Sequence, residues 1–291
     1  MKIGFIGGGN VGKALGLYLK SHELSISGYY SRTQKSSKEA AILTNSREHI
    51  TLKSLAESSD IIFIAVPDQA LKDIDCKVAA MIHEYPMYCK ITWIHVSGAH
   101  SSDCLCEIKR TGCDVGSLHP LQSFGEAKSS AKRLSRTWFT IEGTKMAVHT
   151  MKKLLDKTEG NYSLIDAENK PLYHVGACII SNFLVTLLES GINCFEKVGM
   201  ERKHILQAIE PLIEATLHNI RKKGTLDAIT GPIVRGDINT ILVHLCTLGE
   251  RLPSEIDFYR TMAFKTVLML EGNRLTHKQV NKFQEILEEK S

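Results

Sequence analysis

Six residues near the start of the chain have the types and spacing of a phosphate-binding turn. Positions 7–12 read Gly-Gly-Gly-Asn-Val-Gly, directly after the strand pattern Ile3–Ile6 and directly before a helical pattern. The first glycine of such a turn permits its tight bend, the second lets the backbone approach a pyrophosphate, and the third allows close helix packing. The free N–H groups of the helix then attract the anion. This predicts a dinucleotide site containing Gly7, Gly9, Asn10, Val11 and Gly12.

The residues that end the second predicted strand indicate which dinucleotide would bind. A chain that binds NAD normally places Asp or Glu there, to accept hydrogen bonds from the ribose 2′-hydroxyl. This sequence instead has Ser31, Arg32 and Thr33. No acid repels a 2′-phosphate at this position, and a guanidinium can form charge-assisted hydrogen bonds to it. The three residues therefore favour NADP over NAD.

Candidate ligand-binding residues also lie at the ends of three later strands. Val66, Pro67 and Asp68 end one strand, Ser97 ends the next, and His119 ends a third. Ligands of open α/β folds bind at the carboxyl ends of strands, so we expect these residues to converge. The first three would contact the cofactor. Ser97 would hydrogen-bond either the nicotinamide amide of the cofactor or a carbonyl of the substrate, and His119 would help to orient the substrate. A serine that caps a turn explains Ser97 equally well.

Candidate proton donors lie in the second half of the chain. Lys170 and His174 are four residues apart at the start of a long helical pattern, so they share one side of it. Either could move a proton during hydride transfer, although the same polar residues could instead form contacts between helices or subunits. The pKa of histidine suits proton transfer near neutral pH. Lys170, His174 and His119 all remain candidates for the donor.

A group of His and Cys residues between positions 95 and 119 has the elements of a metal site but not its spacing. The sequence contains no CxxC or HExxH framework there, and two cysteines two residues apart on a helix point in different directions. We therefore expect no bound metal. The group consists of His95, His100, Cys104, Cys106, Cys113 and His119.

These residues need a sheet to position them, and the first half of the chain alternates β-rich runs with helical stretches. That pattern is typical of a doubly wound parallel sheet with helices on both faces, the Rossmann arrangement of the α/β class. The run Ile61–Val66 in one strand is apolar throughout, which indicates a central strand covered on both faces. The strands are expected at Lys2–Ile6, Leu24–Tyr30, Asp60–Val66, Lys90–Ser97, Asp114–Leu118 and Trp138–Ile141.

Beyond residue 145 only Tyr162–Ile165 has a strand pattern, and the remaining patterns are helical. We expect an NADP-binding domain over residues 1–150 and an all-helical substrate and dimerisation domain over 151–291. Pro211 is expected to kink or split its helix. The helices are expected at Asn169–Val198, Glu201–Arg221, Asp237–Gly249, Ser254–Glu271 and Thr276–Glu289.

The composition is that of an ordinary globular protein. The 291 residues carry a net charge of +4 without a dense basic run, so nucleic acid is not an expected partner. The eight cysteines are too sparse for a disulfide framework. The stretch Val175–Leu188 is interrupted by Ser181 and Asn182, and we interpret it as a buried core helix rather than a membrane span. Without a secretory signal pattern, the expected location is the cytoplasm.

The long helix also indicates self-association. Its apolar residues point to several sides and offer more surface than a domain of this length can cover. We therefore expect a homodimer through the helical domain. The positions concerned are Ile179, Phe183, Leu184, Leu187, Leu188 and Ile192.

Six motifs together resemble a bacterial family in which a Rossmann-like NADP oxidoreductase domain precedes a helical domain of unknown function. That helical domain is similar to the C-terminal domain of 6-phosphogluconate dehydrogenase, and pyrroline-5-carboxylate and ketopantoate reductases are more distant relatives. The resemblance implies an NADP-dependent reductase or dehydrogenase that dimerises through its helical domain. The motifs are Gly7–Gly12, Val66–Asp68, Val96–His100, Leu118–Phe124, Lys170–His174 and Gly231–Asp237.

Our leading hypothesis is an oxidoreductase that transfers hydride between NADP(H) and a small polar carbonyl or imine substrate in the cleft between the domains. The alternative from another class is a dinucleotide-binding regulator or sensor without catalysis. An interaction scaffold would leave the glycine loop unexplained.

Overall fold

The computed structural model describes residues 1–288, and the chain divides into two compact units. Unit 1 comprises Met1–Asn182, and unit 2 begins at Phe183. The long helix α8 starts in unit 1 and ends in unit 2. The division falls later than the expected boundary at residue 150, because a last strand and the first turns of α8 belong to unit 1.

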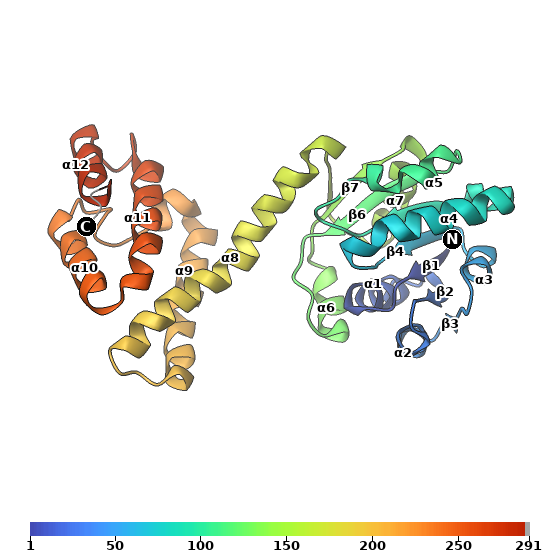
Figure 1. The fold of residues 1–291 in the computed structure, drawn as a ribbon, viewed down its shortest axis with the longest axis horizontal. Helices are drawn as coiled ribbons and strands as arrows, with labels where there is room; N and C mark the ends of the chain where they lie inside the picture. Colours follow the sequence, from blue (N-terminus) through green and yellow to red (C-terminus); the bar gives the residue numbers. More distant parts are fainter. Residues whose placement is uncertain (289–291) are drawn as a thin grey trace. The chain divides into compact units, whose positions relative to one another are not determined.

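Unit 1 is built on one eight-stranded sheet with the order β3-β2-β1-β4-β5-β6-β7-β8 (Figure 1). All neighbouring strands are parallel except β6 and β7, which are antiparallel. The predicted doubly wound α/β fold is thus confirmed. The strands are β1 (Lys2–Ile6), β2 (Ser25–Tyr30), β3 (Arg47–Glu48), β4 (Ile61–Ile64), β5 (Thr92–His95), β6 (Val115–Pro120), β7 (Phe139–Gly143) and β8 (Tyr162–Leu164).

Helices cover both faces of this sheet, and the central strand β4 shows why. Ile61 and Phe63 belong to one apolar cluster, whereas Ile62 and Ile64 belong to the other, since successive strand residues face opposite sides. The apolar run therefore does mark a central strand. The helices of unit 1 are α1 (Asn10–Ser21), α2 (Gln34–Thr44), α3 (Leu52–Glu57), α4 (Leu71–Glu84), α5 (Cys106–Arg110), α6 (Ala127–Leu134) and α7 (Lys145–Lys157), with short 3-10 helices η1 (Asp68–Ala70), η2 (Pro86–Lys90), η3 (Ser102–Leu105) and η4 (Ala167–Asn169).

Unit 2 is helical, and its core lies among its last three helices, around Phe283 and Val267. Pro211 was predicted to kink or split its helix, and it does not split α9: helical backbone angles continue through it, and the interruption lies at Gly224, where φ is +76°. The helices are α8 (Lys170–Lys197), α9 (Arg202–Ala228), α10 (Ile238–Arg251), α11 (Ile256–Leu270) and α12 (His277–Glu288), with the 3-10 helix η5 (Pro253–Glu255).

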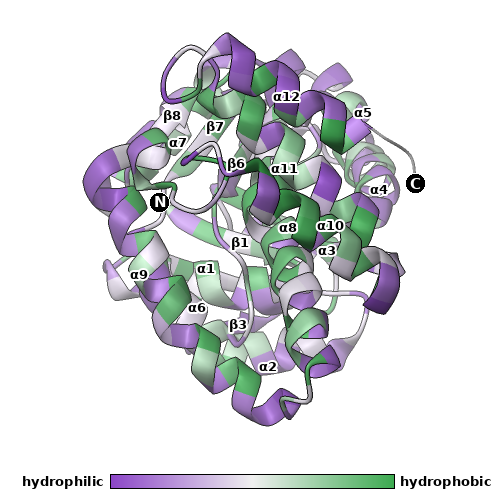
Figure 2. Ribbon diagram, turned by 90° about the vertical axis from the view of Figure 1, so that its left-hand side faces the viewer, coloured by the Kyte–Doolittle hydropathy of each residue, from purple (hydrophilic) through white to green (hydrophobic). Residues whose placement is uncertain are grey.

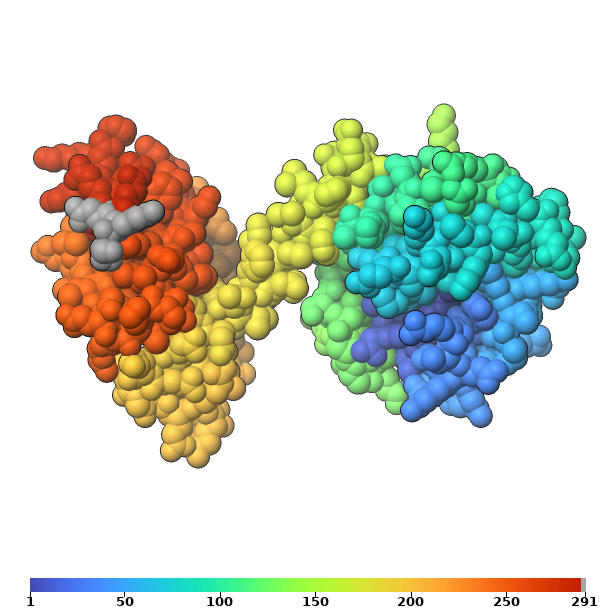
Figure 3. Space-filling model, in the orientation of Figure 1, coloured from blue at the N-terminus to red at the C-terminus, as the bar shows by residue number. Residues whose placement is uncertain are grey.

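Helix α8 differs from the sequence-based expectation of a buried core helix. The ribbon of α8 is largely green, the colour of hydrophobic residues, in Figure 2. The apolar side chains of this helix are mostly exposed within a single chain, for example Ile180 at 76% and Val185 at 68%. Atoms of this helix, shown in yellow, lie at the surface along much of its length (Figure 3). By length and composition alone, Ala167–Lys197 would be able to span a membrane, with a mean hydropathy of 1.7 in its most apolar window. The expectation failed because the sequence shows that a helix is apolar but not what covers it.

Candidate functional site

The glycine loop between β1 and α1 has space for a ligand at one of its three motif glycines. A Cβ on Gly7, whose φ is +108°, would lie 2.2 Å from the carbonyl oxygen of Ala65, and one on Gly12 would lie 2.4 Å from the Gly7 oxygen. At Gly9 the Cβ position has no atom within 4 Å. The fold therefore requires Gly7 and Gly12 to be glycine, whereas Gly9 leaves its backbone open to a ligand.

The start of helix α1 suits an anion. Gly9 is its N-cap, so no side chain caps the first turn, and that turn contains no acidic residue. Gly9 and Asn10 are exposed and Val11 is half-buried. The N–H groups at this end are thus accessible, and the helix dipole adds positive potential.

The segment Ser31–Thr33 lies beside this loop. A Cβ on Gly8 would be 2.3 Å from the Ser36 carbonyl oxygen and 3.2 Å from Ser31 Oγ, which shows how closely the two segments approach. Ser31 Oγ is buried and has no hydrogen-bond partner within the described chain. A buried hydroxyl without a partner is costly, so it marks a place where a ligand would supply one.

Two neighbours of Ser31 complete a group that suits a phosphate. Arg32 is exposed, and Thr33 is the N-cap of α2, whose first turn has no acidic residue. The Thr33 hydroxyl donates to Ser36 Oγ at 3.0 Å. A guanidinium, hydroxyl groups and a helix N-terminus thus come together at the end of β2 and can hold a 2′-phosphate.

The segment after β4 also borders the glycine loop. The Gly7 Cβ position lies 3.3 Å from Val66 Cγ1. Pro67 and Asp68 are exposed, and the Asp68 carboxylate lies 4.0 Å from His100 Nε2. The structure therefore brings together all three segments predicted to hold a cofactor.

Ser97 holds a turn. Its Oγ accepts hydrogen bonds from the backbone N–H groups of Ala99 and His100, both at 3.2 Å. This is the geometry of the turn-capping alternative. The hydroxyl proton of Ser97 stays available for a ligand, because both of these contacts use the oxygen as acceptor.

The histidine that ends β6 meets the start of helix α8. His119 Nδ1 lies 2.7 Å from the Tyr173 hydroxyl, and the two rings are nearly perpendicular at a centroid distance of 5.5 Å. A Cβ on Gly98 would be 2.7 Å from His119 Nε2 and 3.0 Å from His174 Nδ1. Only glycine at position 98 allows both imidazoles to approach the backbone after β5 this closely.

His174 contributes a second ring to this cluster. Its Nδ1 is buried and unpartnered among the described residues, while its Nε2 lies 3.4 Å from Cys178 Sγ. The structure thus brings His174 and His119 to the same glycine. Because the partnerless nitrogen lies beside that glycine, it is available for a proton or a ligand there.

Lys170 is fully buried and donates a hydrogen bond to Ser117 Oγ on β6. Burial lowers the pKa of Lys170 to about 8, while the Glu142 carboxylate acts in the opposite direction. Glu142 is itself buried and accepts from the backbone N–H and the hydroxyl of Ser102, both at 2.7 Å. Lys170 therefore anchors the start of α8 to the sheet and presents no exposed atom to a ligand.

Burial also governs the protonation of the histidines. It lowers the pKa of His119 to about 3, with the nearby Lys170 charge acting in the same direction. The same two causes lower the pKa of the wholly buried His95 to about 3. Both rings are consequently neutral at physiological pH.

Among the described residues, no set of three or more His, Cys, Asp or Glu side chains is placed to hold a metal ion. Burial raises the pKa of Cys104 to about 12, so this thiol is protonated.

Sequence reasoning did not select Tyr173, Ser117 or Glu142. One feature of the sequence could have pointed to Tyr173 as a site residue, namely its position beside His174 in Lys-Pro-Leu-Tyr-His. Its partner His119 is 54 residues earlier, and nothing in the local pattern connects the two.

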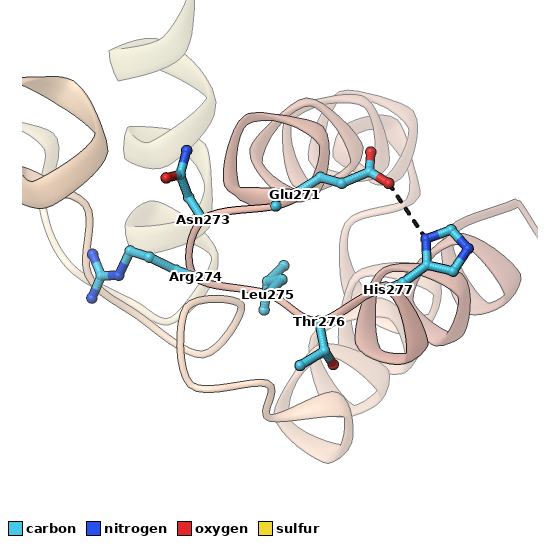
Figure 4. Close-up of a pocket in the computed structure, with 7 residues that line it drawn as sticks. Glu271, Asn273, Arg274, Leu275, Thr276 and His277 are labelled. Atoms are coloured by element: carbon cyan, nitrogen blue, oxygen red, sulfur yellow. Dashed lines mark ion pairs between the residues drawn. The ribbon is translucent and has the colours of Figure 1, made fainter.

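A hollow of about 430 Å³ in unit 2 lies at the connection between α11 and α12 (Figure 4). It is lined by Glu271–His277, and an ion pair of 3.7 Å joins the first and last of these residues. None of the predicted site residues lies there, so we do not assign the function to it.

Comparison with protein families identifies both parts of the chain. Residues 1–120 match the Rossmann-like domain, and residues 137–266 match a domain of unknown function (DUF2520). The chain thus joins a Rossmann-like domain to a DUF2520 domain, which confirms the resemblance seen in the motifs. No curated protein matches the sequence.

Solved structures share this fold at low sequence identity. A Thermotoga maritima protein has a TM-score of 0.70 at 22% identity, covering 94% of this chain and 100% of that one. The pyrroline carboxylate reductase of Plasmodium falciparum with NADP bound scores 0.59 at 15% identity, covering 93% and 98%. A reductive aminase from Aspergillus terreus in complex with NADPH and ethyl-5-oxohexanoate scores 0.60 at 12% identity, covering 98% and 92%.

Proposed function

We propose that this protein is an NADP-dependent oxidoreductase that transfers hydride between NADP(H) and a small polar carbonyl or imine substrate. The observation that carries the proposal is the open backbone at Gly9 together with the Ser31 hydroxyl, which lies against the neighbouring Gly8 and has no hydrogen-bond partner among the described residues. Structures of the same fold include a reductase with NADP bound and a reductive aminase with NADPH, which supports the choice of chemistry.

Each part of the cofactor has residues suited to hold it. The glycine loop and the first turn of α1 would bind the pyrophosphate through backbone N–H groups. Ser31, Arg32 and Thr33 would bind the 2′-phosphate, and Val66, Pro67 and Asp68 would contact the ribose and nicotinamide side. When bound, the nicotinamide supplies or accepts the hydride.

The residues around Gly98 would transfer the proton that accompanies the hydride and would orient the substrate. His174 has a buried nitrogen without a partner, so we assign it the proton that the substrate heteroatom gains or loses. Lys170 was also a candidate from the sequence, but its burial makes it a positioning residue that fixes α8. Ser97 and His119 would orient the substrate.

The exposed face of α8 is proposed to bind a second copy of the chain. An apolar surface of this extent is unusual for a monomer. A membrane would be the other cover, but both ends of the helix make polar contacts with folded parts of the chain. Lys170 bonds to Ser117, while Ser190 and Asn193 both donate to the Glu255 carboxylate. A second copy can cover the apolar face without breaking these contacts.

The test is turnover. NADPH oxidation, followed by absorbance against a panel of small ketones, ketoacids and cyclic imines, should show a substrate whose rate depends on enzyme concentration. A protein that binds NADPH but turns over none of the panel would support the regulator alternative instead.

A further inference from the structure

Tyr173 and His119 form a pair whose chemistry restricts the proton on the imidazole. A phenol has one proton to donate, and the Tyr173 hydroxyl lies 2.7 Å from His119 Nδ1. Burial raises the pKa of Tyr173, with the Thr140 side chain acting in the opposite direction, so the phenol keeps its proton at neutral pH. If the phenol donates, Nδ1 is the acceptor and the ring must carry its own proton on Nε2.

The surroundings of His119 keep this ring neutral. Lys170, Tyr173 and His174 face it from α8, and His95 lies nearby on β5. The Lys170 charge opposes a second positive charge, and none of these groups is an acid that would stabilise one. Glu142, the buried carboxylate on β7, accepts two hydrogen bonds from Ser102 and is paired there.

Nε2 is the nitrogen that faces Gly98 and the ring of His174. It lies 2.7 Å from the Cβ position of Gly98 and makes no hydrogen bond within the described chain. A neutral imidazole with its proton on this nitrogen is a directed hydrogen-bond donor. Such a donor polarises a carbonyl or imine without giving up its proton.

We propose that Tyr173 is a positioning residue that holds His119 as the neutral Nε2–H tautomer, so that Nε2 donates a hydrogen bond to the acceptor atom of the substrate. This inference rests on the proposed reductase function for its substrate. The two histidines then have different roles: His119 polarises the acceptor atom of the substrate, and His174 exchanges the proton.

Nitrogen-15 NMR of the histidine side chains tests the tautomer without any substrate. Each of the twelve histidines gives ring signals that report its tautomer and charge, and His119 is assigned as the ring missing in His119→Gln. Wild-type His119 should show the neutral Nε2–H pattern throughout the range from about pH 5 to 8. In Tyr173→Phe both neutral tautomers should appear.

The chain offers a matched control. The Tyr259 hydroxyl lies 2.7 Å from His244 Nδ1, with rings at 84° and 5.7 Å, which repeats the geometry of the Tyr173 pair in unit 2. Tyr259→Phe should change the signals of His244 and leave those of His119 as they are.

Three results would overturn the proposal: a wild-type His119 with its proton on Nδ1, a His119 charged at about pH 6, or an unchanged tautomer in Tyr173→Phe. With a substrate in hand, Tyr173→Phe should also lower kcat about tenfold and leave the KM for NADPH unchanged. Because the NMR result does not require turnover, an inactive protein would contradict the reductase proposal separately from the tautomer.

Discussion

The ammonium group of Lys170 donates a hydrogen bond to the hydroxyl of Ser117, and no part of the lysine side chain is exposed. The contact joins the first residue of α8 to strand β6, two residues before His119. It therefore sets where Tyr173 and His174 lie relative to the sheet.

This buried lysine should make stability depend on pH. Its pKa is lowered from 10.5 to about 8 in the folded protein, so the unfolded chain binds more protons between these values. The free energy of unfolding should therefore rise from about pH 8 to 10, by about 2 kcal/mol from this group. Urea unfolding of wild type and Lys170→Met at both pH values measures the difference. An identical pH dependence in the two proteins would contradict the assignment.

Gly98 should tolerate no side chain without disturbing both histidines. A methyl group there would lie 2.7 Å from His119 Nε2 and 3.0 Å from His174 Nδ1, so the rings must move away. Gly98→Ala should lower kcat at least about tenfold, while the Kd for NADPH stays the same because the glycine loop is untouched. Gly125→Ala is the control, since its Cβ position is open. Unchanged turnover in Gly98→Ala would show that the rings have no fixed role.

His174 should be needed for the proton step. His174→Ala should lower kcat by about 10² to 10⁴ and leave NADPH affinity nearly unchanged, as general acid–base catalysis predicts. The measurement is steady-state kinetics on the substrate found in the panel, with NADPH binding by calorimetry beside it. Full turnover would assign His174 to packing and leave His119 as the next donor to test.

The apolar face of α8 should hold two copies together. Light scattering at micromolar concentration should give twice the chain mass of 32.4 kDa. Ile180→Asp, which places a charge at a side chain 76% exposed in one chain, should yield monomers. Ile42→Asp is the matched control, because Ile42 is 71% exposed on α2. A monomeric wild type, or one that needs detergent to stay in solution, would contradict the dimer.

The sequence predicted the sheet well because its strands are apolar and regularly spaced. All seven expected strands are present, and β1 begins and ends where expected. The strand β3 has only two residues, too few to form a pattern. Pro211 was expected to kink or split its helix, but the non-helical backbone inside α9 lies at Gly224, because a positive φ is readily adopted by glycine.

The candidate site was less predictable than the fold. The glycine loop could be recognised because its residues are consecutive, and the structure shows why Gly7 and Gly12 must be glycine. The burial of Lys170 could not be foreseen, since it depends on Ser117 and the sheet rather than on the neighbours of Lys170 in sequence. The pairing of Tyr173 with His119 was missed for the same reason.

The preference of the protein for NADP over NAD has a direct test. Calorimetry should show NADPH binding at least about tenfold more tightly than NADH, because Ser31, Arg32 and Thr33 can bind a 2′-phosphate and no acid repels it. Arg32→Ala should remove most of that difference, whereas Arg136→Ala, which removes an exposed arginine elsewhere on unit 1, should leave it intact. Equal affinity of the wild-type protein for NADPH and NADH would contradict the account.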